Sequence, residues 1–313
     1  MIGLWRGMCV GFVVGALICA CDTDTQNSDT AGRVDIGDGH HLYLDCRGTG
    51  SPTVVLQSGF GNAGDIWSSS ESDSLAVHPA LAESTRVCAY DRPGSLVTTT
   101  VRDGVVVDAE EPTPGRSDEV AMPRDPAEVV DELHDLLESA GETGPYVLVG
   151  HSMGGPLQAL FAATYPSDVA GLVLVDAPMP VLRDSVTPEQ WELMAHPQLT
   201  PGSYPEGYIA ETYSMDELFD EIEGGPPLPP VPVVALVRGV NEPLPDHLPA
   251  GMSAADLEAL HDAEPRAQAA FVAGLPDAEL ITVPGTTHYL QTQRPDAVID
   301  AVNRVLSRDD GQT

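Results

Sequence analysis

The sequence predicts an α/β fold in which a mostly parallel central sheet carries helices on both faces and an inserted lid. Short apolar segments alternate with helical patterns along most of the chain, and this alternation is typical of parallel sheets that are covered on both sides. The 313 residues suffice for one large domain with an insertion, and not for two independent cores.

We expect this domain to span residues 34–309. In its first half the pattern predicts two short strands separated by a turn, two buried strands, a long polar surface loop, and an amphipathic helix with Asp125 as its N-cap. The corresponding residues are 34–47 for the strand pair, 53–56 and 86–90 for the buried strands, 95–124 for the loop and 126–140 for the helix.

The second half continues the alternation and ends in a closing helix. We expect strands at 147–149, 169–175, 232–237 and 280–283, and helices from 158 onward, at 254–273 and at 295–306. Residues 180–230 interrupt this pattern over a length far beyond that of ordinary loops. We therefore expect an inserted lid there rather than a simple connection.

A short motif follows the strand at 147–149. Gly150-His151-Ser152-Met153-Gly154 fits the pattern Gly-x-Ser-x-Gly, with a strand before it and a helix after it. In this context the pattern indicates a nucleophile elbow, in which a strained turn lifts the serine hydroxyl clear of the sheet. Ser152 is therefore the candidate nucleophile, and it needs a base to accept its proton.

Nine histidines could supply that base. His288 stands just past the last predicted strand, in a loop at the carboxyl edge of the sheet. Parallel α/β sheets bind ligands at this edge, so the loop can meet the elbow. His151 adjoins the serine, but on that turn we expect its side chain to point away from Ser152. His288 is therefore the candidate base.

Four features of the chain resemble the α/β-hydrolase superfamily. They are the Gly-His-Ser-Met-Gly-Gly run at 150–155, the Asp91-Arg92-Pro93-Gly94 turn, the order serine, acid, histidine, and the Gly-x-x-His-Tyr sequence at 285–289. The resemblance covers about residues 34–309 and is closest to the branch of small bacterial esterases, lipases and proline-iminopeptidase-like enzymes. It implies the α/β-hydrolase fold and a Ser-His-acid mechanism, although this fold hosts many reactions.

The resemblance offers two positions for the acid. Asp176 ends the strand after the elbow helix. Glu242 follows the next strand, where Gly239-Val240-Asn241-Glu242 stands in place of the usual Gly-x-x-Asp, and Asp246 is a third option nearby. An orienting carboxylate should sit on a rigid, buried element, which favours Asp176 and leaves Glu242 as the alternative.

The resemblance also implies the backbone N–H groups of Phe60 and Met153 as oxyanion donors. Family members often carry His-Gly before the first of these residues, whereas this chain has Ser58-Gly59. A backbone donor tolerates that change. The resemblance further makes the second and fourth strands neighbours in the sheet, so that Cys46 and Cys88 can form a disulfide, which persists in an exported domain.

Composition limits the partners. Acidic residues outnumber basic ones 48 to 14, and the formal net charge is −34, which argues against nucleic acid or an anionic membrane surface as a partner. The sequence after the first 21 residues has no His-x-x-x-His or Cys-x-x-Cys cluster and no Gly-rich phosphate loop. We therefore expect no metal and no cofactor.

Residues 1–21 resemble an export signal. Arg6 precedes an uncharged apolar run at 10–20 that is too short to span a bilayer, and Ile18-Cys19-Ala20-Cys21 resembles a lipoprotein lipobox. We expect lipid on Cys21 and a disordered polar tether over 22–33. An ordinary secretory signal is the alternative, so the protein is expected to be a membrane-anchored lipoprotein or else secreted.

These features together predict an exported serine hydrolase that cleaves a small-molecule carboxylic ester. One alternative is an aminopeptidase, which would act on an amide and bind the substrate ammonium through carboxylates of the lid. A rival from another class is a non-catalytic binding lipoprotein on the same fold. The available lid carboxylates are Glu189, Glu192, Glu206, Glu211, Asp216 and Glu217.

Overall fold

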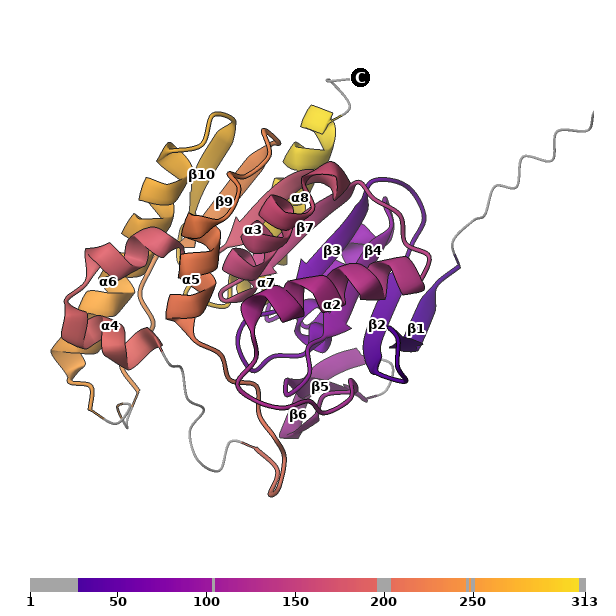
Figure 1. Ribbon diagram of the computed structural model, residues 1–313, viewed down its shortest axis with the longest axis horizontal. Coiled ribbons are helices and arrows are strands. Elements are labelled where there is room, and N and C mark those ends of the chain that lie inside the picture. The colour runs from indigo at the N-terminus through magenta and orange to yellow at the C-terminus, as the bar shows by residue number, and fades with distance from the viewer. Residues whose placement is uncertain (1–27, 103–104, 196–203, 246–247, 249–250, 310–313) are drawn as a thin grey trace, which may run out of the picture.

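A computed structural model describes residues 28–102, 105–195, 204–245, 248 and 251–309. Its centre is an eight-stranded sheet with the order β1-β2-β4-β3-β7-β8-β9-β10 (Figure 1). The strands are β1 Thr30–Asp35, β2 His41–Arg47, β3 Thr53–Gln57, β4 Val87–Asp91, β7 Tyr146–His151, β8 Val169–Val175, β9 Val233–Arg238 and β10 Ala278–Val283.

The sheet is mostly parallel, as the sequence predicts. Only β2 runs antiparallel to its neighbours β1 and β4, and every pairing from β4 to β10 is parallel. Strands β3, β4, β7, β8 and β9 are buried along their whole length. Burial on both faces explains why they read as continuous apolar runs in the sequence.

Alternate residues of the buried central strands β3, β4, β7, β8 and β9 feed two separate cores. Val55 and Leu148 point into a core with helices α2 Pro126–Ser139, α3 Gly154–Thr164, α5 Met215–Gly224 and α6 Ala254–Ala273. Their neighbours Val54 and Val147 point into the opposite core with α1 Val77–Leu81, α7 Leu290–Gln293 and α8 Pro295–Asp309. The period of two along these strands therefore sets the three-layer architecture.

No helix in the described ranges combines the length and the apolar character that crossing a membrane requires.

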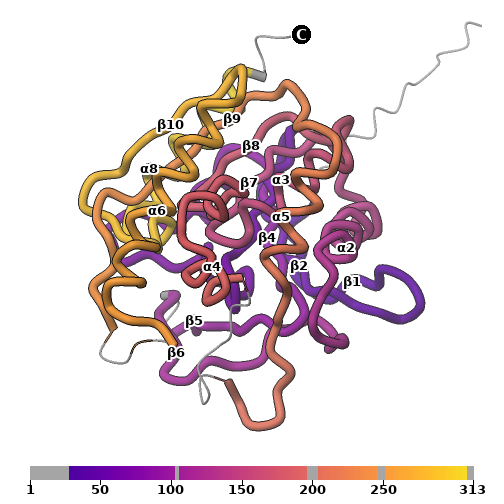
Figure 2. Tube along the Cα trace, turned by 60° about the vertical axis from the view of Figure 1, so that its left-hand side comes forward, coloured from indigo at the N-terminus to yellow at the C-terminus, as the bar shows by residue number. Residues whose placement is uncertain are grey.

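The segment at 180–230 contains the short helix η3 Pro180–Ser185, then α4 Pro188–Ala195 and α5. The lid helix α5 packs against α3, which follows the elbow (Figure 2). Trp191 of α4 stacks on Phe219 of α5 with ring centroids 5.4 Å apart, and its indole N–H donates to Asp216 at 2.7 Å. The insertion thus has its own aromatic contacts and packs against α3, the helix that follows the elbow.

Two predictions about segments were wrong. Residues 30–33, expected to belong to a disordered tether, form the start of β1 and pair with β2. The region 95–124, expected to be a loop, contains the antiparallel hairpin of β5 Leu96–Arg102 and β6 Val105–Pro114 (Figure 1). β1 is mostly exposed, and β5 and β6 mix valines with threonines and acidic residues without a period of two, so neither segment shows the apolar alternation that marks a half-buried strand.

The register of the sheet places Cys46 of β2 directly opposite Cys88 of β4. The two residues are fully buried and are joined by a disulfide. The structure therefore contains the bond that the sequence resemblance implied. The predicted signal peptide and Cys21 lie outside the described residues.

Candidate active site

Ser152 lies at the sharp turn between β7 and α3. Its backbone has φ +50°, a left-handed value that is uncommon for a residue with a side chain. The Ser152 N–H donates to Val175 O at 2.9 Å, and Ser152 O accepts from Gly155 N–H at 2.9 Å. A Cβ atom at Gly154 would collide with the backbone oxygens of Gln57 and Ser58. Packing on both sides therefore holds the strained turn in place.

Asp176 follows β8 directly and also has a left-handed backbone, with φ +46°. Its Oδ2 lies 2.7 Å from Nδ1 of His288, which follows β10. Glu242 also lies beside His288, and its Oε1 accepts from the His288 backbone N–H at 2.9 Å. The Asp176 carboxylate thus contacts the His288 imidazole, whereas the Glu242 carboxylate contacts the His288 main chain. Asp246 lies outside the described residues.

Arg238, at the end of β9, was not singled out by the sequence. Its Nη1 donates to Asp176 Oδ2 at 2.6 Å and its backbone N–H donates to Asp176 Oδ1 at 3.1 Å. Its Nη2 donates to Glu264 and to the carbonyl of His261, each at 2.6 Å. The arginine and the aspartate are both almost completely buried. Asp176 therefore receives three hydrogen bonds, which fix its carboxylate and favour its charged form.

The charges around the imidazole set its protonation. Burial lowers the pKa of His288, but the hydrogen bond and charge of Asp176 outweigh burial and raise the pKa of His288 above its ordinary value. Burial likewise opposes ionisation of Asp176, yet the bonds from His288 and the charge of Arg238 keep the pKa of Asp176 below its ordinary value. The arrangement provides an ionised carboxylate beside a basic imidazole.

His151 is buried beside the site. Its Nε2–H donates to the backbone oxygen of His288 at 2.9 Å, and its Nδ1 accepts from the amide of Gln291 at 3.2 Å. Burial, reinforced by the nearby His288, lowers the pKa of His151 to about 3, so the ring is neutral at physiological pH. Because His151 directly precedes Ser152, these two hydrogen bonds connect the elbow to the loop of His288 and to Gln291. Within the described residues, no hydrogen bond joins the Ser152 hydroxyl to His288, and such bonds are often long without substrate.

The loop after β3 approaches the serine closely. A Cβ atom at Gly59 would lie 3.0 Å from Ser152 Cβ and 3.0 Å from His151 Nδ1, so a side chain here would crowd both residues. The next N–H group in the chain is that of Phe60. Neither Phe60 N–H nor Met153 N–H donates to a backbone carbonyl elsewhere in the part of the chain that the structure describes. Two free donors are therefore available beside Ser152.

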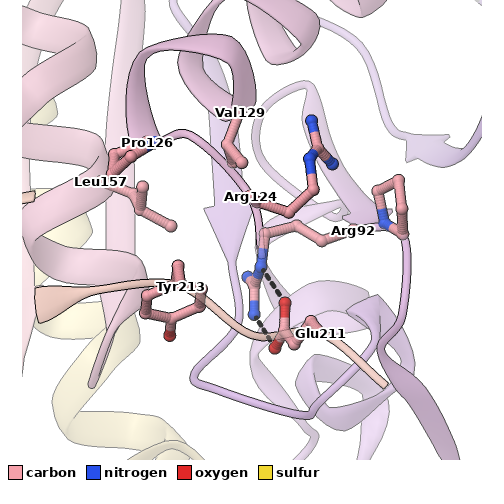
Figure 3. A pocket seen from close by; sticks show the side chains of 8 residues that line it. Arg92, Arg124, Pro126, Val129, Leu157, Glu211 and Tyr213 are labelled. Carbon is pink, nitrogen blue, oxygen red and sulfur yellow. Dashed lines mark hydrogen bonds and ion pairs between the residues drawn. The ribbon is translucent and has the colours of Figure 1, made fainter. Parts of the chain in front are cut away.

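Residues of the turn at 91–94 form hydrogen bonds with the loop after β3. Asp91 is fully buried and accepts from Gly64 N–H at 2.9 Å and from the guanidinium of Arg116 at 2.7 Å. Arg92 is also buried and forms an ion pair with Glu211, which comes from the segment before α5 (Figure 3). The sequence suggested Glu211 as one possible ligand for a substrate ammonium, but its carboxylate already has a cationic partner.

Two groups in the described ranges have the donor atoms of a metal site. Cys46 and Cys88 lie near Glu142, and His134 lies near Asp135 and Glu138. The cysteines are joined by their disulfide, and Glu142 pairs with Arg86. His134 contacts Asp168 at 3.2 Å and stacks on Tyr165. Because protein partners already engage the two cysteines, Glu142 and His134, we assign neither group to a metal.

Comparison with known proteins agrees with this geometry. The sequence model described as "Alpha/beta hydrolase family" matches residues 54–301. An uncharacterized protein of Schizosaccharomyces pombe is 38% identical over 110 residues, which are 35% of this chain and 17% of that protein. Human monoacylglycerol lipase ABHD6 is 29% identical over 126 residues, which are 40% of this chain and 30% of the lipase.

Similarity of fold extends over nearly the whole chain. A thermophilic esterase from Thermogutta terrifontis has a TM-score of 0.54 at 19% identity, with 90% of this chain and 99% of the esterase covered. The two sequence relatives, in contrast, are matched over less than a third of their own lengths. The fold is therefore shared along the chain, while sequence similarity is confined to a part of it.

Proposed function

The chain belongs to the alpha/beta hydrolase family, and we propose that it is a serine hydrolase that cleaves a carboxylic ester through an acyl-enzyme. The observation that carries this proposal is the 2.7 Å contact between His288 Nδ1 and Asp176, beside a serine at φ +50°. Nucleophile, base and orienting acid come from the carboxyl ends of β7, β10 and β8, where ligands of parallel sheets bind.

The proposed reaction has two halves. Ser152 Oγ attacks the ester carbonyl while His288 Nε2 accepts its proton, and Asp176 stabilises the imidazolium that forms. The N–H groups of Phe60 and Met153 donate to the oxyanion. His288 then gives the proton to the leaving alcohol, and a water molecule, activated by the same imidazole, releases the acid and regenerates Ser152.

Asp176 fits the role of acid better than Glu242. Its carboxylate contacts the ring nitrogen of His288 and is itself held by Arg238, whereas Glu242 contacts the His288 main chain. The aminopeptidase alternative loses one lid carboxylate, because Glu211 pairs with Arg92. Trp191 and Arg183 both donate to a second one, Asp216.

We also propose that the protein is exported and anchored by lipid on Cys21. Arg6, the short apolar run and the Ile18-Cys19-Ala20-Cys21 sequence support this part of the proposal. An exported location agrees with the disulfide between Cys46 and Cys88, because such bonds persist in oxidising compartments.

The test is a screen of p-nitrophenyl esters of graded acyl length beside aminoacyl p-nitroanilides. We expect turnover of esters, covalent labelling by a fluorophosphonate, and loss of both in Ser152→Ala and His288→Ala with the fold retained. Turnover of the anilides alone would favour the aminopeptidase. A folded protein that neither labels nor turns over any substrate would favour the non-catalytic binding protein.

A further inference from the structure

Two buried ion pairs lie at opposite ends of strand β4. Arg86 precedes the strand and pairs with Glu142, and Arg92 follows it and pairs with Glu211. All four side chains are at most 4% exposed. A buried ion pair is weak evidence for stability, because the cost of desolvation offsets the attraction. The pair at the carboxyl end, next to the candidate active site, therefore invites another explanation.

The remaining contacts of Arg92 are with the loop that approaches Ser152. Its Nη1 donates to Ser58 O and its Nη2 to Gly59 O, each at 2.7 Å. The Gly59 carbonyl and the Phe60 N–H belong to one planar trans peptide and point in opposite directions. A guanidinium on that carbonyl therefore fixes the direction of the Phe60 N–H and polarises it as a donor.

Glu211 completes this arrangement from the lid side. Its Oε2 accepts from Arg92 Nε at 3.0 Å and its Oε1 accepts from Arg92 Nη2 at 2.9 Å. The same Oε1 accepts from the Gly61 N–H, and the backbone N–H of Glu211 donates to Gly94 O at 3.0 Å. The ion pair thus holds the peptide groups on both sides of Phe60, and its acidic member comes from the segment that leads into α5.

We infer that the Arg92–Glu211 ion pair is a clamp that positions the oxyanion donor of Phe60 and couples the lid segment to the catalytic geometry. This inference rests on the proposed serine-hydrolase function. In this inference both residues act through the orientation of the 59–60 peptide. Loss of the clamp should weaken binding of the transition state and leave ground-state binding nearly unchanged, because the oxyanion exists only along the reaction.

The experiment compares Arg92→Met and Glu211→Gln with Arg86→Met and Glu142→Gln. The second pair is a matched control, because Arg86 also binds a glutamate and two backbone carbonyls, those of Ser28 and Gly48. Each variant is measured for kcat and KM on the best p-nitrophenyl ester, for inhibition by an alkylboronic acid, and for thermal unfolding. The boronate forms a tetrahedral adduct on Ser152, so its affinity reports the oxyanion site.

Arg92→Met should lower kcat by about 10²-fold, at the lower end of the loss seen when one oxyanion donor is removed. KM should change less than about threefold, and the boronate should bind more weakly by nearly the same factor as kcat/KM falls. Glu211→Gln keeps an acceptor for Gly61 and should lose less, about tenfold. The Arg86 and Glu142 variants should unfold at lower temperature but keep kcat within about twofold.

Equal kcat in the Arg92 and Arg86 variants would overturn the clamp. The clamp would also be overturned if Arg92→Met raised KM and the boronate bound as tightly as it does to the parent enzyme. If Arg92→Met does not fold, Glu211→Gln is judged by the same two comparisons: its kcat against that of the Glu142 variant, and its loss of boronate affinity against its change in KM. Failure of the proposed function is seen separately, because Ser152→Ala would then retain the activity that the clamp variants are measured against.

Discussion

Asp176→Asn tests the assignment of the acid, and the structure determines how the substituted side chain must lie. Asp176 Oδ2 accepts from His288 Nδ1 and from Arg238 Nη1, and among the described residues Oδ1 accepts from the Arg238 backbone N–H alone. An amide NH2 in the Oδ2 position would face a cation and an N–H donor. In the Oδ1 position it would face one neutral N–H, so we expect the asparagine oxygen to remain on His288.

In that orientation His288 keeps its tautomer and the enzyme loses only the negative charge opposite the imidazolium. Two unit charges about 4 Å apart interact by about 4 kcal/mol at an effective dielectric constant of 20. Because about 1.4 kcal/mol corresponds to a factor of ten, kcat should fall by about 10²- to 10³-fold. This loss is smaller than the roughly 10⁴-fold loss known for a triad forced into the wrong tautomer.

The assay is kcat on a p-nitrophenyl ester, with circular dichroism as the check that each variant is folded. Glu242→Gln is the matched control, because glutamine still accepts from the His288 N–H, and it should keep kcat within about threefold. A loss below tenfold in Asp176→Asn, or a larger loss in Glu242→Gln, would move the acid to the loop after β9. A loss of 10⁴ or more would contradict the predicted orientation of the amide.

Three further predictions follow from other parts of the chain. The kcat/KM profile should lose activity as pH falls through a midpoint above 6.5, because Asp176 outweighs burial and raises the pKa of His288, whose neutral form is the base; a midpoint below 6.5 would contradict this. Replacing Cys46 and Cys88 by Ala should lower the free energy of unfolding in urea by about 4 kcal/mol, since the disulfide closes a loop of 42 residues; an unchanged midpoint would refute it. Cys21→Ser should release active enzyme from the membrane fraction or block maturation, and wild-type protein found soluble with an N-terminus beyond Cys21 would exclude the anchor.

The parts of the fold that could be predicted are those with a local physical cause. Strands such as β7 and β8 are buried on both faces, so their apolar runs are unmistakable. The elbow is readable because Gly154 stands where a Cβ atom would meet backbone oxygens. The candidate nucleophile and base were found from this local logic, and Asp176 from its place at a strand end.

The parts that could not be predicted depend on contacts far apart in the sequence. Asp176 and Arg238 are 62 residues apart, and Arg92 and Glu211 are 119 apart. In a chain with 48 acidic residues, no single carboxylate stands out as the partner of a given arginine. The hairpin of β5 and β6 could not be predicted for another reason: its strands mix valines with threonines and acidic residues and show no apolar period of two.

Three residues of the Asp91-Arg92-Pro93-Gly94 turn form hydrogen bonds with segments that lie far away in the sequence. Asp91 holds Gly64 and Arg116, Arg92 holds the carbonyls of Ser58 and Gly59, and Gly94 accepts from Glu211. Gly94 has φ +81°, and a side chain there would collide with the Glu211 backbone. This four-residue turn lies at the carboxyl end of β4. It therefore joins the loop after β3, Arg116 after β6 and the segment before α5. A motif that resembles the family's in sequence is, in the structure, the part that joins the loop of Ser58 and Gly59 to the segment before α5.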